Sequence, residues 1–462
     1  MSGPIELIAE VHFALSARRL VVGPTTVVEE SAVDRLARIL AQLAVVPDAT
    51  ATAPILTPSD DLTKVPGLVG DLIEWIVRSA RRPNRVLALG AAITIVGTLI
   101  GRRVAGPTRS ATHMYVVGLA GTGVGKQHAI DCSKNALIAA GAIELIGPDA
   151  FSSAPAVVKF IKGKQLALCL MDEFGSFLGK INNSQANRYE IEITGVFRKL
   201  WGISFGRYDS TATAKDDSKA VDCPALSIYG VSTPEEFYSA LKLDDLGNGF
   251  LNRFLILETG KRGPEQSPVK GADQVPIVLQ MALKRIYQPT PHSFATVGKL
   301  DPPTTLKWSK GAEHIYNELS RVMDEEPDAQ RNKLRARVPE MAIRLATIRA
   351  AGRLSSEVSI EDMVWGKDLA LNSSNMLCEG VERHMVITFE FSEICPEILN
   401  RMRLRGGTMS RRDVLRSFEK HVKRGLDIEL ALKHLEDSER IIREEVKPHS
   451  GGRKSVVFTL ME

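Results

Sequence analysis

The sequence predicts an α/β protein with a largely parallel sheet, then a mostly helical region, then a winged helix-turn-helix at the carboxyl end. Between residues 111 and 262, short apolar runs alternate with helical stretches, a pattern typical of buried parallel strands. Helical periodicity follows to about Val386. Three helical stretches and two extended ones around a glycine-containing tip complete the chain.

The chain divides where these patterns change. A stretch rich in Pro, Thr and Asp without periodicity, Pro47 to Pro66, is typical of a linker. We therefore expect an accessory segment at 1–46, the linker at 47–66, a helical lead-in at 67–110, the α/β core at 111–262, a helical lid at 263–390 and the winged helix-turn-helix at 391–462.

Composition excludes several classes of protein. The 462 residues are 44% hydrophobic, enough for a large core, and the net charge of +4 does not by itself imply a polyanionic partner. Five cysteines lie far apart without a Cys-x-x-Cys pair, which argues against a zinc site and a disulfide framework. Because the amino terminus lacks a signal-peptide pattern, we expect a cytoplasmic protein.

One continuously apolar run, Val86 to Ile100, is a candidate for a membrane span. A span needs about 20 residues, whereas this run has 15. It is also rich in small residues, so we predict a helix buried under the core and no membrane partner.

A glycine-rich turn follows the predicted strand Met114 to Val117. The turn, Ala120-Gly121-Thr122-Gly123-Val124-Gly125-Lys126, precedes a helical stretch from His128 to Ala140. Backbone N–H groups of such a turn cradle phosphates, and the lysine reaches the outer phosphates of a triphosphate. We expect ATP to bind from Ala120 to His128; the alternative is a tight turn without a ligand.

Gln127 occupies the position where a serine or threonine hydroxyl usually binds Mg²⁺. Its longer amide oxygen leaves two arrangements open. Gln127 contacts the metal directly or through water, or the metal depends on Asp172 alone.

Two carboxylates, Asp172 and Glu173, end the apolar run that begins at Leu166. A buried parallel strand delivers such charges at its carboxyl end. We expect Asp172 to hold Mg²⁺ and Glu173 to orient the attacking water. An ordinary acidic turn is the alternative, but the order of the two motifs favours ATP.

Two further residues are candidates for the same chemistry. Ser232 follows the predicted strand Ala225 to Val231, and it senses the γ-phosphate, belongs to a cap of the next helix, or does both. Arg253 lies among apolar neighbours ahead of the predicted strand Phe254 to Leu257. It is an arginine finger for a neighbouring subunit's ATP or part of a structural salt bridge.

With these residues together, the chain from about 65 to 390 resembles AAA+ ATPases, specifically a helicase-type ATPase domain of phage, prophage and satellite replication proteins. The resemblance rests on the glycine-rich turn Ala120 to Lys126, which matches the P-loop pattern, on the Asp172-Glu173 strand and on Gly249-Phe250-Leu251-Asn252-Arg253-Phe254. More distantly, the chain is similar to minichromosome-maintenance helicases. That similarity implies a nucleotide-sensing role for Arg344 on a lid helix; the alternative is a solvated surface arginine.

Two basic regions are candidate DNA contacts. Lys215 and Lys219 lie in a predicted hairpin between Phe205 and Cys223, and an ordinary solvated loop is the alternative. From Asn400 to Glu462 fifteen Lys and Arg face ten Asp and Glu. The candidate phosphate contacts there are Arg411, Arg412, Arg453 and Lys454. The expected recognition helix from Asp427 is acidic, which favours backbone binding over base reading and leaves a protein partner open.

The sequence thus predicts a ring-forming homo-oligomer, a hexamer, that uses ATP and Mg²⁺ as a DNA translocase or helicase in replication of a mobile element. Two alternatives stay open: an ATP-gated DNA-binding initiator or regulator with slow turnover, and a protein-remodelling or defence ATPase.

Overall fold

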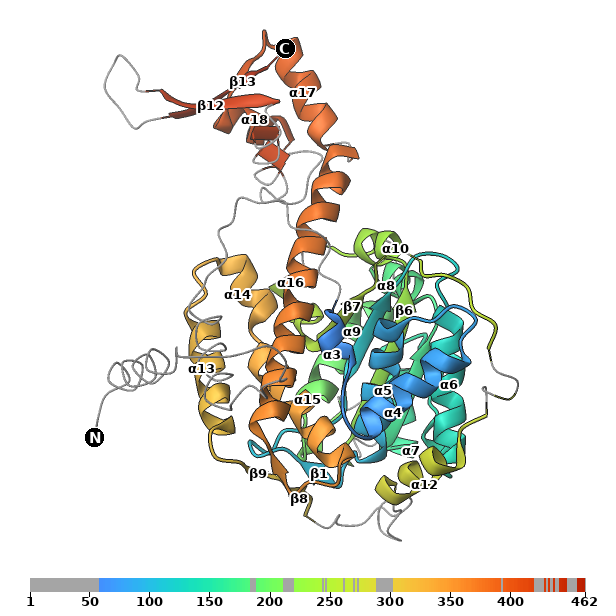
Figure 1. The fold of residues 1–462 in the computed structure, drawn as a ribbon. Helices are drawn as coiled ribbons and strands as arrows, with labels where there is room; N and C mark the ends of the chain where they lie inside the picture. Colours follow the sequence, from blue (N-terminus) through green and yellow to red (C-terminus); the bar gives the residue numbers. More distant parts are fainter. Residues whose placement is uncertain are drawn as a thin grey trace, which may run out of the picture.

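The computed structural model in Figure 1 has an α/β body and a smaller carboxyl-terminal unit, joined by one long helix. The structure describes residues 58–461 except 183–187, 211–219, 243–244, 246, 261, 269–270, 272–273, 288–301, 392–393, 419–427, 429–430, 433–434, 437–439 and 447–454. The predicted accessory segment and most of the predicted linker lie outside these residues.

A parallel sheet organises the body, with strand order β3-β6-β2-β7. Its register pairs Leu119 with both Ser232 and Glu258, and Met171 with Gly230, so all four strands end at the same edge. The predicted parallel α/β core is confirmed. The strands are β2 (Tyr115–Leu119), β3 (Leu166–Met171), β6 (Ala225–Ser232) and β7 (Phe254–Glu258).

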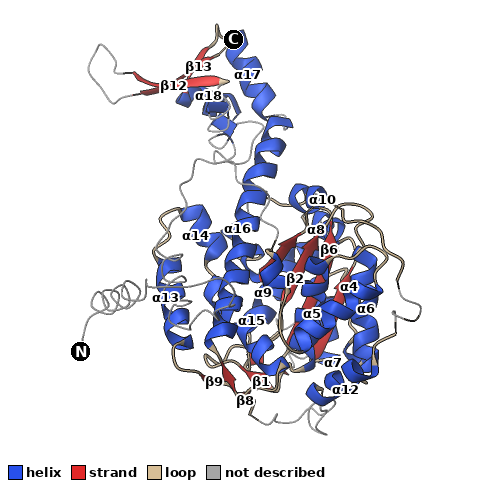
Figure 2. Cartoon of the chain, viewed as in Figure 1, coloured by secondary structure: helices blue, strands red, loops and turns tan. Residues whose placement is uncertain are grey.

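Helices cover both faces of this sheet (Figure 2). In β2, Val116 joins one hydrophobic core, whereas Tyr115, Val117 and Leu119 join a second, because successive side chains of a strand point to opposite faces. The first core contains α4 (Leu68–Ser79), α5 (Arg85–Leu99) and α6 (Lys126–Ala139). The second contains α7 (Ala154–Gly163), α8 (Phe174–Ile181), α9 (Arg188–Gly202) and α10 (Pro234–Ser239).

The apolar run from Val86 to Ile100 forms α5, as predicted for a buried helix. All its residues from Val86 to Leu99 are buried, and its helix contacts all four strands of the sheet. Within the described ranges, no helix is long and apolar enough to cross a membrane.

The region predicted as a helical lid is mostly helical and shares the first core with α4 and α5. A short strand pair, β1 with β8, also ties it to the body, whereas β9 pairs with β10 inside the region itself. Its elements are α12 (Ile277–Ile286), β8 (Thr304–Thr305), β9 (Lys307–Trp308), α13 (Ala312–Asp324), α14 (Ala329–Arg335), α15 (Val338–Gly352), β10 (Glu357–Val358) and α16 (Ile360–Phe391). Short elements elsewhere in the body are α3 (Asp60–Thr63), β1 (Val104–Ala105), η1 (Ile143–Leu145) and η2 (Leu251–Arg253).

Helix α16 leads from the body to the carboxyl-terminal unit, which has its own hydrophobic core (Figure 1). Its antiparallel sheet has the order β11-β13-β12. The predicted strands at 441–446 and 455–460 have these bounds in the structure, and Ser410 caps the predicted second helix by accepting the Asp413 N–H at 3.2 Å. The elements are α17 (Ile394–Leu404), β11 (Thr408–Ser410), α18 (Arg411–Phe418), β12 (Ile441–Val446) and β13 (Ser455–Leu460).

The predicted hairpin between Phe205 and Cys223 has paired arms. Strands β4 (Arg207–Tyr208) and β5 (Val221–Asp222) are antiparallel. Its tip, with Lys215 and Lys219, lies outside the described residues.

Gly90 sets how closely α5 approaches the sheet, and we predict that Gly90→Val destabilises the protein. A Cβ at Gly90 would lie 2.9 Å from the Tyr229 ring and 3.2 Å from both Leu257 and Val116. Overpacking of this kind costs about 1–3 kcal/mol of unfolding free energy. Urea unfolding followed by circular dichroism measures the loss.

Gly163→Val is the matched control, because nothing lies within 4 Å of a Cβ there. We expect a change within about 0.5 kcal/mol. Equal unfolding midpoints for the two variants would contradict the close packing of α5.

Candidate active site

The glycine-rich turn lies at the carboxyl edge of the sheet, between β2 and α6. Gly123 and Gly125 have φ of 74° and 92°, values that favour glycine. Residues Gly121 to Gly123 are exposed, and no side chain caps the amino terminus of the 14-residue helix α6. The exposed N–H groups and the helix dipole make this turn suitable for an anion.

Lys126 and its neighbours point in three directions. The Lys126 ammonium donates to the Ala120 carbonyl at 3.1 Å, back across the turn. The Gln127 amide donates to the Asp131 carboxylate at 2.9 Å. The His128 imidazole lies 3.0 Å from both the Ile76 carbonyl and the Ser79 hydroxyl, and therefore ties α6 to α4. Of these three side chains, Lys126 is therefore the one that lies at the turn.

Asp172 and Glu173 reach the same edge from β3. Both are exposed, and the Asp172 carboxylate accepts the Glu173 N–H at 3.0 Å. Glu173 has a φ of 53°, in the left-handed region that costs a non-glycine residue free energy. Strand β6 separates β3 from β2, so the acidic pair and the turn lie about 10 Å apart, two strand spacings.

This edge offers Mg²⁺ the ligands it prefers. Mg²⁺ binds one or two carboxylates together with phosphates and water, and Asp172 supplies an exposed carboxylate beside the turn. Among the described residues, no group of three or more His, Cys, Asp or Glu forms a metal site made of protein ligands alone. The exposed Asp172 carboxylate is a ligand of the kind that Mg²⁺ accepts together with phosphate oxygens and water.

Ser232 lies between the two motifs and is buried. Its hydroxyl accepts the Gly175 N–H at 3.2 Å and donates to the Glu236 carboxylate at 3.1 Å. The predicted cap is confirmed, because the Thr233 hydroxyl accepts the Glu236 N–H at the start of α10. Ser232 thus anchors the helix that follows Glu173, and its sensor role stays a prediction.

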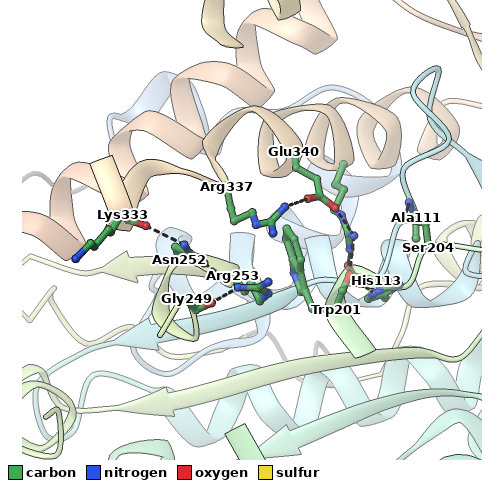
Figure 3. A network of polar contacts seen from close by, with 11 residues as sticks. Ala111, His113, Trp201, Ser204, Gly249, Asn252, Arg253, Lys333, Arg337 and Glu340 are labelled. Atoms are coloured by element: carbon green, nitrogen blue, oxygen red, sulfur yellow. Dashed lines mark hydrogen bonds and ion pairs between the residues drawn. The ribbon is translucent and has the colours of Figure 1, made fainter. Parts of the chain in front are cut away.

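Arg253 lies at the opposite edge of the sheet, directly before β7. The five residues of β7 span about 17 Å, so Arg253 does not reach the glycine-rich turn of its own chain. Its guanidinium donates to the Gly249 carbonyl and to the Asn252 side chain at 3.2 Å, and lies 5.6 Å from the Trp201 ring (Figure 3).

The surroundings of Arg253 are strongly basic. Burial, with Arg337 and Arg198 nearby, lowers the pKa of Arg253 to about 10. Arg337 is paired with Glu340 at 3.2 Å. A positive cluster at this edge favours a negatively charged partner group.

Arg344 is fully buried in α15, so the alternative of a solvated surface arginine is wrong. It donates to the His113 and Trp201 carbonyls at 2.9 and 2.8 Å and to the Glu340 carboxylate at 2.7 Å, and stacks 4.0 Å from the Trp201 ring. His113 precedes β2, whereas the P-loop follows it. Arg344 therefore lies at the Arg253 edge, away from Lys126 of the same chain.

The basic residues of the carboxyl-terminal unit are placed in part. Arg411 and Arg412 are exposed at the start of α18. Arg453, Lys454 and the predicted cap Asp427 lie outside the described residues. The structure thus brings two of the six predicted DNA contacts onto one exposed helix end.

The sequence pattern did not single out Arg262, which lies against the glycine-rich turn. A Cβ at Gly123 would be 3.5 Å from its guanidinium carbon. The strand β7, which precedes Arg262, could have indicated this position. Because β7 is parallel to β2, the residues that follow the two strands lie at the same edge of the sheet.

In sequence, the chain matches no protein-family model and no curated protein.

His113 gives the structure a pH dependence that can be measured. Burial and the charge of Arg344 lower its pKa from 6.5 to about 3. Below pH 6.5 the unfolded chain binds a proton that the folded chain does not. Each unit by which the pH falls below 6.5 therefore lowers the free energy of unfolding by about 1.4 kcal/mol.

We predict that His113→Gln flattens this dependence between pH 6.5 and 5.0, by about 2 kcal/mol in unfolding free energy. Glutamine retains a donor for the Trp201 carbonyl. Urea unfolding at both pH values measures the difference, and His314→Gln, an exposed site in α13, should keep the wild-type slope. An unchanged slope in His113→Gln would show that His113 is not buried as a neutral group.

Proposed function

We propose that this chain hydrolyses ATP at the edge formed by the P-loop and the Asp172-Glu173 pair. The observation that carries the proposal is their convergence at one sheet edge, across the single strand β6. A phosphate on the turn and a carboxylate about 10 Å away leave room for a metal ion and its water between them.

Each residue has a separate task in this proposal. Lys126 and the exposed N–H groups of the turn bind the phosphates. Asp172 holds Mg²⁺, which neutralises charge on the phosphates when bound. Glu173 accepts a proton from the attacking water and orients it. Ser232 fixes the start of α8, and with it the backbone next to Glu173.

The location of Arg253 supports a shared site in an oligomer. It lies at the sheet edge away from the P-loop of its own chain, within a cluster of arginines. A head-to-tail ring joins two different surfaces of neighbouring subunits, and we propose that this edge of one subunit faces the nucleotide edge of the next. We propose a hexamer in which Arg253 stabilises charge on the neighbour's ATP, with Arg344 holding this edge together.

DNA is the proposed substrate of the motor. The support is the resemblance to AAA+ replication helicases, the hairpin β4–β5 and the exposed arginines of α18. We propose a winged helix-turn-helix for the unit from α17 to β13, which contacts the DNA backbone. The chain would then act as a translocase or helicase in replication of a phage or other mobile element.

One observation favours the alternative of an ATP-gated initiator with slow turnover. The Gln127 amide is engaged by Asp131, along the helix rather than at the turn. In this arrangement the metal depends on Asp172, and weaker metal binding slows hydrolysis.

We predict ATPase activity that DNA stimulates, together with unwinding of a forked duplex. Glu173→Gln should lower kcat at least 100-fold and leave ATP affinity within about threefold, because only the general base is lost. Glu313→Gln, an exposed change on α13, is the control and should keep wild-type kcat.

ATPase activity that neither single-stranded nor double-stranded DNA stimulates would contradict the proposed function as a DNA translocase or helicase. DNA binding at one site without strand separation would favour the initiator.

A mixing experiment tests the shared site. Arg253→Ala should abolish hydrolysis while sparing ATP binding, since the finger acts on a neighbour. Mixing it with Glu173→Gln should restore activity at about a quarter of the interfaces in a random ring, measured as phosphate release. Arg321→Ala on the exposed face of α13 should stay active alone. Full activity of Arg253→Ala alone would contradict the finger assignment.

A further inference from the structure

A short strap, residues Arg262 to Gln266, crosses from the end of β7 to the turn between α4 and α5. The Gln266 N–H donates to the Arg81 carbonyl at 2.9 Å, and its side-chain amide donates to the Val77 and Ala80 carbonyls at 3.0 and 2.9 Å. Glu265 also pairs with Arg82 at 2.7 Å. These contacts fix the strap although it has no regular secondary structure.

The strap places the Arg262 guanidinium flat against the P-loop. A Cβ atom on Gly123 would lie 3.5 Å from the guanidinium carbon of Arg262 and 3.6 and 3.7 Å from its two terminal nitrogens. Three nearly equal distances mean that the plane of the guanidinium faces the loop. Any side chain at Gly123 would lie against Arg262, and the φ of 74° there also favours glycine.

Glu265 is the acidic residue of the strap, and the charges of Arg81, Arg82 and Arg262 together lower its pKa. The two carboxylate oxygens of Glu265 are bonded to Arg81 and Arg82. Arg262 itself is exposed and therefore accessible to a ligand on the loop. With Lys126 at the base of the turn, this arrangement brings a second cation to the same phosphate cradle.

The sheet order decides which part of a nucleotide Arg262 meets. Strand β6 and then β3, with the acidic pair, lie on one side of β2, and β7 lies on the other. The chain leaves β7 close to the loop, because the Thr259 N–H donates to the Leu119 carbonyl at 2.8 Å. Arg262 therefore flanks the P-loop on the side away from Asp172 and Glu173.

We propose that Arg262 binds the non-reacting end of the nucleotide, the α-phosphate and ribose that ATP and ADP share. The inference rests on the proposed ATPase, since the hydrolysed phosphate must face the carboxylates and the rest of the ligand must leave the loop on the other side. A guanidinium offers a planar fork of donors to a phosphate at that position. Arg262 is thus a binding residue that sets affinity without taking part in hydrolysis.

The test compares nucleotide affinity with turnover. Arg262→Ala should raise Kd for ATP and for ADP by about tenfold each, the loss of one charge-assisted contact, with kcat within about twofold of wild type. Arg262→Lys should recover part of the affinity, since it retains the charge without the planar fork. Titration of fluorescent ATP and ADP analogues gives both constants, and Arg285→Ala on the exposed side of α12 is the matched loss of charge.

The outcomes separate the two proposals. Failure of the wild-type protein to bind ATP, or unchanged binding by Lys126→Ala, would remove the ATPase itself. If the wild type binds through Lys126 and Arg262→Ala leaves both Kd values unchanged, the role of Arg262 is overturned while the ATPase stands. Weaker binding of ATP alone would also overturn it, because the contact would then lie at the terminal phosphate.

Discussion

The parallel pairing of β2 with β6 on one side and β7 on the other is the constraint on which the rest of the site depends. Parallel strands end at the same edge, so whatever follows each strand is delivered to one place. The glycine-rich turn, Ser232 and the strap with Arg262 lie there, and β3 adds the acidic pair. The residues that precede the strands, among them His113 and Arg253, gather at the other edge.

This sheet is stable because both faces are covered. Helix α5 is buried along almost its whole length, and its glycine at position 90 lets the backbone approach Tyr229 and Leu257 closely. Because both faces of the sheet are buried, the strands have continuous apolar sequences rather than alternating apolar and polar residues. The loops that carry the chemistry therefore extend from a rigid base, while their own residues stay exposed.

The edge with Arg253 depends on a buried charge. An isolated guanidinium in the interior costs many kcal/mol, and Arg344 offsets this cost with two backbone carbonyls, the Glu340 carboxylate and the face of Trp201. The same tryptophan also lies beside Arg253. One ring thus connects the buried scaffold to the half-buried arginine that we propose for the subunit interface.

Local pattern alone was enough to predict much of the fold. Periodicity, glycine and capping residues over a few neighbouring positions predict several features of the fold. These features are the bounds of β3, β12 and β13, the buried helix α5 and the helix that begins at Lys126. The P-loop and the acidic pair were predicted as sequence motifs for the same reason.

The features that only the tertiary structure determines involve residues far apart in the chain. Strand order, the burial of Arg344, the common core of α4, α5 and the region after 277, and the position of Arg262 on Gly123 all depend on such contacts. Periodicity in one sequence does not encode which distant segments meet. The sequence by itself determined the turn and the carboxylates, and the parallel sheet decided that they share one edge and that Arg253 lies at the other.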